Sequence, residues 1–240
     1  MSTLPNTFEP YDDLTQPALT IEHYAETFVR VPKTPLFRRP VTLTEITGPT
    51  RLTGKLKPGN NDLSQPNPDK PRAMGQLIRV AGKVQDGDGH PVRGTLIELW
   101  HCNSAGRYIH PMDANNPNPI DTNFIGSGRV ATDAAGRYEF LTIKPAAYPY
   151  PNHPTRWWRP PHIHMSIFGD GFMSRLVTQM FFPGDPFNDI DLILQAVPDP
   201  KGRARLVARQ VPMDEMPMLN VVGFEHDIVL RGHRQTPFGM

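Results

Sequence analysis

Apolar residues from residue 76 onward form short runs rather than long helical stretches. The runs are rich in β-branched and aromatic residues, and Gly and Asp separate them. Regular short runs of this kind are typical of β-strands. The expected strands occupy residues 77–84, 95–100, 137–142, 162–168, 176–182 and 224–231. The pattern predicts an all-β fold built as an antiparallel sandwich or barrel.

The segments between these runs have the composition of turns. Three of them are Asp86-Gly-Asp-Gly-His-Pro91, Asn103-Ser-Ala-Gly106 and Asp133-Ala-Ala-Gly136. Gly and Asn tolerate positive φ, and Asp closes turns through its carboxylate. The first segment resembles part of a calcium loop, but the later ligands and the closing Glu of an EF-hand are missing. We therefore interpret all three as connecting turns.

Helices are expected to be few and short. Asn188 or Asp189 is predicted to cap one short helix that contains Ile193 and Leu194, because both residue types favour the N-cap position. A second helix is predicted over residues 201–209, before Pro212.

The first 75 residues differ from the rest of the chain. They hold 11 of the 28 prolines, and proline fixes φ and removes a backbone donor. The segment carries six apolar residues that need a surface to bury against: Ile21, Tyr24, Phe28, Val31, Leu36 and Phe37. We therefore favour an extended Pro-rich arm over a disordered tail. Residues 1–75 are predicted to pack against another subunit, and residues 76–240 to form the β domain.

Charge and composition narrow the choice of partner. The chain has 25 Lys and Arg against 24 Asp and Glu, a formal net charge of +1, and no basic tract. Nucleic acid and an anionic membrane are therefore excluded as expected partners, which leaves a small molecule or a protein. Cys102 is the sole cysteine, so an intrachain disulfide and a Cys-rich metal cage are impossible. With no apolar leader and no long apolar span, these features predict a cytoplasmic protein.

Two histidines open one of the predicted strands, in the segment Trp158-Arg-Pro-Pro-His-Ile-His164. Side chains at i and i+2 of a strand lie on the same face. Two adjacent imidazoles repel when protonated, whereas a metal ion requires them neutral and convergent. His162 and His164 are therefore candidate ligands, although an isolated pair of this kind can equally be structural or solvent-facing.

Two tyrosines lie at the ends of predicted strands, where binding sites are commonly built. Tyr108 follows one strand, and Tyr148 lies in a Pro-rich loop 14 residues before His162. A phenol has a pKa of about 10, so it binds as phenolate at neutral pH only beside a strongly charged, hard cation such as ferric iron. A half-buried, hydrogen-bonded tyrosine is the more common case, and spacing alone leaves both interpretations open.

Longer motifs resemble the intradiol ring-cleaving dioxygenases. The resemblance covers residues 76–238 and is strongest to the iron-bearing β chains of members that cleave protocatechuate. It is carried by Ile143-Lys-Pro-Ala-Ala-Tyr-Pro-Tyr150, Trp158-Arg-Pro-Pro-His-Ile-His164, Leu96-Ile-Glu-Leu-Trp100, Gly106-Arg-Tyr108, Val177-Thr-Gln-Met-Phe-Phe182 and Asp227-Ile-Val-Leu-Arg-Gly232.

The resemblance implies a β-sandwich that holds Fe(III) through two tyrosines and two histidines. Matched motif by motif, Tyr148 and His162 would be the axial ligands, and Tyr108 and His164 the equatorial ligands. A hydroxide or water would complete the coordination. A catecholic substrate would then bind through both oxygens, displacing Tyr148 and the hydroxide, which take its protons, and O2 would attack the ring.

The resemblance also implies roles for residues around the iron. Arg159 would stabilise developing negative charge, and Gln179 would lie near the substrate; otherwise they are a surface cation and a solvent-facing strand residue. Trp100 and Tyr150 would line the substrate pocket, although aromatics at strand positions are usually core residues. The sequence departs from the family pattern at Pro161, where a small residue is expected, and at Tyr150, where tryptophan is frequent.

The expected function is conversion of protocatechuate and O2 to 3-carboxy-cis,cis-muconate, in the β-ketoadipate pathway of aromatic catabolism. The family implies an iron-free α chain as partner. Catechol or hydroxyquinol is the alternative substrate, although enzymes for these usually carry a helical N-terminal region. A non-catalytic sandwich is a second alternative. A cupin-like barrel is a third, and it would require a downstream carboxylate and histidine, for which His226 after Glu225 is the only candidate.

Overall fold

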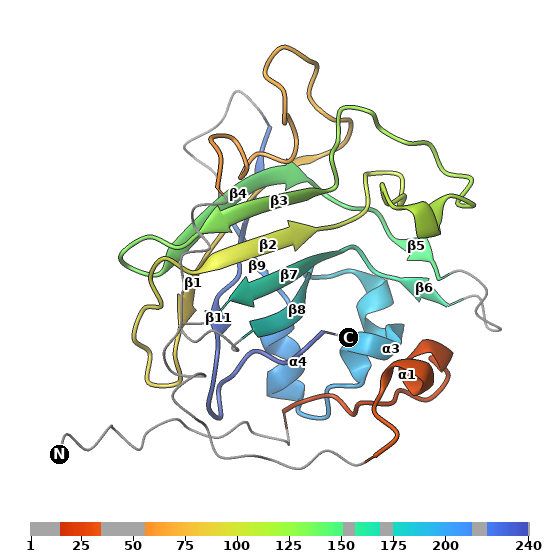
Figure 1. Ribbon diagram of the computed structural model, residues 1–240, viewed down its shortest axis with the longest axis vertical. Coiled ribbons are helices and arrows are strands. Elements are labelled where there is room, and N and C mark those ends of the chain that lie inside the picture. Colours follow the sequence, from red (N-terminus) through yellow and green to blue (C-terminus); the bar gives the residue numbers. More distant parts are fainter. Residues whose placement is uncertain (1–14, 35–55, 151–156, 169–174, 213–219, 240) are drawn as a thin grey trace.

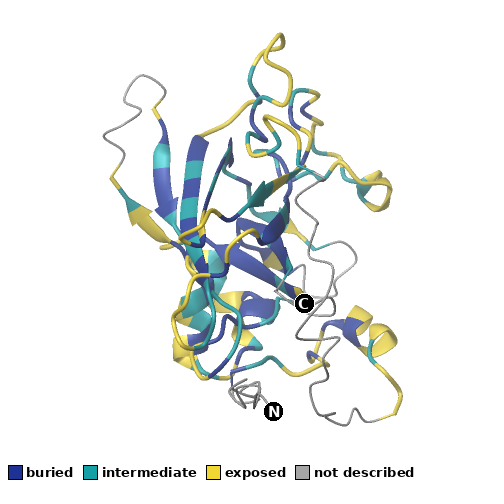
Figure 2. Ribbon diagram, turned by 60° about the vertical axis from the view of Figure 1, so that its left-hand side comes forward, coloured by how far each residue is buried: buried dark blue, intermediate teal, exposed yellow. Residues whose placement is uncertain are grey.

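The computed structural model describes residues 15–34, 56–150, 157–168, 175–212 and 220–239. Most of its regular structure is β-strand, arranged in two main sheets, with a few short helices beside them (Figure 1). Buried positions concentrate in the strands, whereas the connecting loops are largely exposed (Figure 2). The prediction of a mainly β protein with minor helices is confirmed.

The first sheet is built around β1 (Leu77–Gln85). This strand pairs antiparallel with β4 (Arg137–Ile143) on one side. On its other side it pairs with β10 (Val222–Glu225) and β11 (Ile228–Val229), both in parallel orientation. Strand β9 (Arg209–Val211) then pairs antiparallel with β10.

The prediction of purely antiparallel pairing is wrong for this sheet. Between β1 and β10 the chain passes through the second sheet and the helices, and β10 and β11 then run in the same direction as β1, which gives parallel ladders. The run predicted over residues 224–231 is also two strands, because His226 and Asp227 interrupt it. There the Asp227 carboxylate accepts a hydrogen bond from the backbone N–H of Lys83 at 2.8 Å.

The second sheet is antiparallel throughout. Its strands lie in the order β3 (Ser127–Ala131), β2 (Leu96–Trp100), β7 (His162–Phe168) and β8 (Arg175–Phe181). Alternate residues of β7, namely Ile163, Met165 and Ile167, join a buried apolar cluster with side chains of the first sheet. By strand alternation, His162, His164 and Ser166 occupy the opposite face of β7. The inner face therefore supplies the core, and the outer face carries the candidate ligands.

Short elements lie over that outer face. Strands β5 (Tyr148–Pro149) and β6 (Trp158–Arg159) form a two-stranded ladder. Short helices η3 (Pro186–Ile190), α3 (Leu192–Gln195) and α4 (Pro200–Leu206) follow β8. Leu194 and Leu206 pack with Phe181 of β8 in a separate apolar cluster. A further turn of helix, η2 (Pro111–Asp113), lies in the long loop after β2.

The caps of these helices differ from the prediction. Neither Asn188 nor Asp189 caps α3; Asp191 does, by accepting hydrogen bonds from the backbone N–H groups of Ile193 and Leu194. The Asn188 side chain instead donates to the carbonyl of Phe182 at 2.8 Å. The helix predicted over residues 201–209 is present as α4, with Asp199 at its N-cap.

The described part of the N-terminal segment folds back on its own chain. It contains one helix, α1 (Ala25–Arg30), which lies near α3 (Figure 1). Ile21 and Tyr24 are buried in a cluster with Trp157 and Ile193. Phe28 is 54% exposed, and the predicted apolar contacts of Leu36 and Phe37 lie outside the described residues. No helix within the described ranges is long and apolar enough to cross a membrane.

Candidate metal centre

Strand β7 places the two histidines of the H-x-H motif side by side. Their Nε2 atoms are 3.2 Å apart, so both imidazoles share one face, as predicted. His164 pairs across the sheet with Trp100 of β2 and Gln179 of β8. The Trp100 ring lies parallel to the His164 ring, with centroids 4.9 Å apart, and therefore fixes the plane of the imidazole.

The two candidate tyrosines reach the histidines from neighbouring segments. Tyr108 lies in the loop after β2, where its backbone N–H donates to the Asp113 carboxylate at 2.7 Å. Gly106 has φ of +78°, and a Cβ there would lie 3.1 Å from that of Tyr148. Glycine therefore allows the two segments to approach closely. The rings of Tyr108 and Tyr148 are perpendicular, with centroids 5.6 Å apart.

The Nε2 atom of His162 lies at the centre of this group. The Nδ1–H of its ring donates to the carbonyl of Pro160 at 2.7 Å, which leaves a lone pair on Nε2. The Nε2 atom is 3.5 Å from the hydroxyl oxygen of Tyr108. Metal-binding histidines commonly donate their second ring N–H to a carbonyl in the same way. The tautomer of His162 is therefore suited to a ligand.

Burial keeps the two histidines neutral. Desolvation, followed by the charge of Arg159, lowers the pKa of His164 to about 3 and holds the pKa of His162 well below its usual range. Neutral imidazole is the form that binds a metal. These two side chains therefore need no deprotonation before binding at neutral pH.

Burial has the opposite effect on the two phenols. It raises the pKa of Tyr148, although the nearby Arg159 opposes that rise. It also raises the pKa of Tyr108, and the proximity of Tyr148 adds to the effect. Neutral phenols at this depth become ligands only when a strongly charged cation stabilises the phenolates. The donor set of two phenols and two imidazoles therefore fits ferric iron.

Arg159 is the single cation among these groups, and its side chain is only 3% exposed. Its Nη1 lies 3.2 Å from Nε2 of His162, and its Nη2 donates to Oε1 of Gln179 at 2.7 Å. Burial opposes the positive charge, but the carboxylate of Asp191 and the phenols of Tyr148 and Tyr108 together outweigh it and raise the pKa of Arg159. Arg159 and Gln179 are thus buried residues of the site, and neither is the solvent-facing group of the alternative interpretation.

Tyr150 belongs to an aromatic wall beside the site. Its ring contacts Tyr24 edge to face at 5.2 Å and lies 5.0 Å from the ring of Trp157. The hydroxyl of Tyr24 accepts a hydrogen bond from Arg30 at 3.0 Å. Sequence reasoning identified Tyr150, but it named Tyr24 only as an apolar residue of the arm and did not place Tyr24 or Arg30 beside Tyr150. Both lie in the N-terminal Pro-rich segment, which is distant in sequence from Tyr150.

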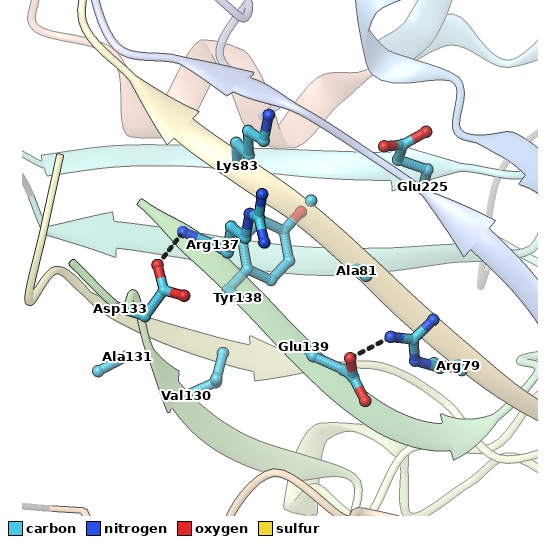
Figure 3. A pocket seen from close by; sticks show the side chains of 11 residues that line it. Arg79, Ala81, Lys83, Val130, Ala131, Asp133, Arg137, Tyr138, Glu139 and Glu225 are labelled. Carbon is cyan, nitrogen blue, oxygen red and sulfur yellow. Dashed lines mark hydrogen bonds and ion pairs between the residues drawn. The ribbon is translucent and has the colours of Figure 1, made fainter. Parts of the chain in front are cut away.

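Other polar groups lie apart from this centre. Figure 3 shows a hollow over β1 and β4 that none of the predicted site residues lines, and there Arg79 pairs with Glu139. The turn after β1 brings the ligand atoms of Asp86, Asp88 and His90 within 4.8 Å of one another, close to solvent. His226 lies between β10 and β11 in the other sheet, which removes the histidine that a cupin-like site would need.

Comparison with known proteins identifies the class. The chain matches the dioxygenase family over residues 46–232. It is 44% identical over 233 residues to the protocatechuate 3,4-dioxygenase β chain of Burkholderia cepacia, covering 97% of both chains. It is 30% identical over 171 residues to the protocatechuate 3,4-dioxygenase α chain of Pseudomonas putida, covering 70% of this chain and 78% of that one.

A solved structure shares the fold. The crystal structure of 3-chlorocatechol 1,2-dioxygenase from Rhodococcus opacus 1CP has a TM-score of 0.53 at 24% identity. The match covers 70% of this chain and 63% of that chain, which is less than two thirds of the relative's length. The family match over residues 46–232 and the 44% identity to the Burkholderia cepacia β chain show that the chain belongs to the dioxygenase family, and within it to the intradiol dioxygenases.

Proposed function

We propose that Tyr108, Tyr148, His162 and His164 hold a ferric ion, and that the chain is the iron-bearing β subunit of a protocatechuate 3,4-dioxygenase. The observation that carries the proposal is the convergence of His164, Tyr108 and Arg159 within 3.5 Å of Nε2 of His162. The similarity to the Burkholderia cepacia β chain over nearly the full length favours protocatechuate as the substrate.

Each residue of the site has a different proposed role in ring cleavage. When bound, ferric iron would act as a Lewis acid that prepares the ring of a chelated catechol for attack by O2. Tyr148, as a phenolate, is a base strong enough to accept a proton from a catechol hydroxyl, because its ordinary pKa is about 10. Arg159 interacts with Tyr148 and stabilises negative charge on that side of the site.

The remaining groups position the substrate and exclude water. Gln179 is fully buried beside Arg159, and its amide orients polar groups of the substrate. Trp100 and Tyr150 form aromatic walls on which the ring can pack. Substitution of Trp100 or Tyr150 is expected to change substrate affinity before it changes iron content.

We also propose the organisation of the whole subunit. Residues 76–240 form the catalytic β-sandwich, since side chains of both main sheets share one apolar cluster. Residues 1–75 form a Pro-rich arm for subunit packing, and an α chain is the partner in a cytoplasmic hetero-oligomer. The similarity to both chains of protocatechuate 3,4-dioxygenase supports this assembly.

A second substrate class is catechol or hydroxyquinol. The chain is 34% identical to the chlorocatechol 1,2-dioxygenase of Rhodococcus opacus, but only over 49% of its length. The matching part of the chain favours the same iron chemistry in both proteins. We expect the segments outside the match to determine which substrate is preferred. A non-catalytic partner chain is disfavoured, because the four candidate ligands and Arg159 lie together.

The test is the product formed by iron-loaded protein purified with its partner chain. Protocatechuate, catechol and hydroxyquinol are supplied separately, O2 uptake is recorded, and each product is identified by NMR. We expect one O2 consumed per protocatechuate and 3-carboxy-cis,cis-muconate as product, with slower turnover of the other two. Cleavage outside the diol, or no uptake with any of the three, would contradict the proposal.

A further inference from the structure

Arg159 is held from several sides in a fully enclosed position. Its Nε donates to Oδ2 of Asp191 at 2.9 Å, and its Nη2 donates to Oδ1 at 3.3 Å. The ring of Trp157 lies 5.5 Å from the guanidinium carbon. A guanidinium bound through two nitrogens has a fixed plane, so its Nη1 has one direction, toward His162.

Asp191 is itself fixed to the fold. Its side chain is 0% exposed, and its Oδ1 also caps α3 by accepting from the backbone N–H groups of Ile193 and Leu194 at 3.1 and 2.8 Å. Ile193 and Leu194 are buried in two apolar clusters, so α3 is anchored on both sides. The carboxylate position is therefore set by the packing of α3 against the rest of the chain.

The fixed position of the Asp191 carboxylate has two effects on the side of the site where the substrate would bind. The Nη1 of Arg159 is directed at the group around His162, and the Oε1 of Gln179 faces the guanidinium. Because a guanidinium only donates, the oxygen end of the Gln179 amide must face it, and this fixes which end points away. One carboxylate thereby orients two of the residues proposed to meet the substrate.

We propose that Asp191 is a positioning residue for ring cleavage, which sets the orientation of Arg159 and, through it, of Gln179. This inference rests on the proposed function of the same site. Asp191 does not touch the four candidate iron ligands in any contact of the described residues, so its effect passes through the arginine.

The experiment uses the full chain, iron-loaded and purified with its partner chain. Asp191→Asn keeps an acceptor oxygen for the α3 cap but removes the charge. Asp191→Glu keeps the charge but moves the carboxylate by one methylene. Asp199→Asn is the matched control, because Asp199 also caps a helix and also lies near an arginine, 3.7 Å from Arg205, away from the site.

We expect kcat with protocatechuate to fall on the order of 100-fold in both Asp191 variants, as for a misplacement of a catalytic group by about 1 Å. KM should stay within about threefold of the wild type, because the loss concerns the transition state rather than ground-state binding. Iron content and the visible tyrosinate-to-iron band should match the wild type. Asp199→Asn should keep wild-type kcat, and its thermal midpoint should fall less than that of Asp191→Asn.

A double variant tests whether Asp191 acts through the arginine. If it does, Arg159→Gln with Asp191→Asn should be no slower than Arg159→Gln alone, because the two changes remove one unit. Multiplication of the two losses would overturn the proposal. Wild-type kcat in folded, iron-loaded Asp191→Asn and Asp191→Glu would also overturn it, as would loss of folding in both while Asp199→Asn folds. A wild-type protein that binds no iron would instead overturn the proposed function.

Discussion

At the residue scale, the site depends on which nitrogen or oxygen of each side chain is left to bind. The carbonyl of Pro160 accepts a hydrogen bond from the Nδ1–H of His162, and the parallel ring of Trp100 fixes the plane of the His164 ring. The sequence predicted both histidines, because an i, i+2 pair on one strand is a local pattern. It could not predict Asp191, which lies 32 residues from the arginine it pairs with and follows the residues that were predicted as the helix cap, Asn188 and Asp189.

Replacing Tyr148 by phenylalanine tests its role as a base. The variant keeps the ring that contacts Tyr108 but has no hydroxyl to accept a substrate proton. We expect kcat/KM for protocatechuate to fall by about 100- to 10,000-fold, the range for loss of a general base. Tyr138→Phe is the control, because the Tyr138 hydroxyl donates to the His226 carbonyl away from the site. Equal activities of the two variants in steady-state O2 uptake would contradict this role.

A pH effect is expected from His226, whose burial lowers its pKa from 6.5 to about 4. The folded chain keeps this ring neutral where the unfolded chain would protonate it. Its contribution to stability is therefore complete above pH 6.5 and is lost as the pH falls from 6.5 toward 4. The free energy of unfolding should fall by up to about 1.4 kcal/mol per pH unit from this group.

Urea unfolding of iron-free protein at pH 7 and pH 5 measures this effect. His226→Leu should weaken the pH dependence, because leucine has no group that titrates. The Nε2 of the ring it replaces is buried and has no hydrogen-bond partner within the described chain. A wild-type slope in His226→Leu would show that this histidine is not responsible.

At the element scale, the short β-branched and aromatic runs predicted most strands but did not predict how the strands pair. Six predicted runs coincide with strands, yet β3, β5, β6 and β9 were missed. β5 and β6 are two-residue strands with prolines in or near them, and β3 begins with Ser, Gly and Arg rather than with an apolar run. The parallel pairing of β10 and β11 with β1 depends on a crossover between distant segments, which no local pattern encodes.

Gly82 is the position where that pairing is most sensitive. A Cβ at this residue would lie 1.9 Å from the backbone carbonyl oxygen of His226, and the backbone cannot move aside cheaply. Gly82→Ala should therefore destabilise the protein by about 3 kcal/mol or more, the upper end for overpacking. Ala81→Ser, on the opposite face of β1, is the control. A shift in the urea midpoint equal to that of the control would refute the expected clash.

At the scale of the whole molecule, part of the N-terminal segment packs on the same chain beside the candidate site. The sequence predicted an extended arm that packs on a partner. Within that segment, residues 15–34 contain α1 and bury Ile21 and Tyr24 against Trp157 of the same chain. Gln16 also accepts a hydrogen bond from the backbone of Phe238 near the C-terminus. Composition identified the unusual segment, but the surface that receives it is assembled only by tertiary folding.

Tyr24→Ala tests whether this docking stabilises the molecule. The change removes a buried ring that contacts both Tyr150 and Trp157. We expect a loss of about 3 kcal/mol in the free energy of unfolding, as for other buried aromatic truncations. Tyr24→Phe keeps the ring and should lose less than half as much. Wild-type stability of Tyr24→Ala in urea would show that the segment does not dock stably.

The most direct test of the iron centre is the visible absorption spectrum of the iron-loaded protein purified with its partner chain. Phenolate bound to ferric iron absorbs visible light, so we expect a coloured protein whose band shifts when protocatechuate is added without O2. Tyr108→Phe and Tyr148→Phe should each weaken the band, and Tyr138→Phe should leave it unchanged. A protein that stays colourless after loading with ferric iron and does not respond to protocatechuate would contradict the assignment of Tyr108, Tyr148, His162 and His164 as ligands.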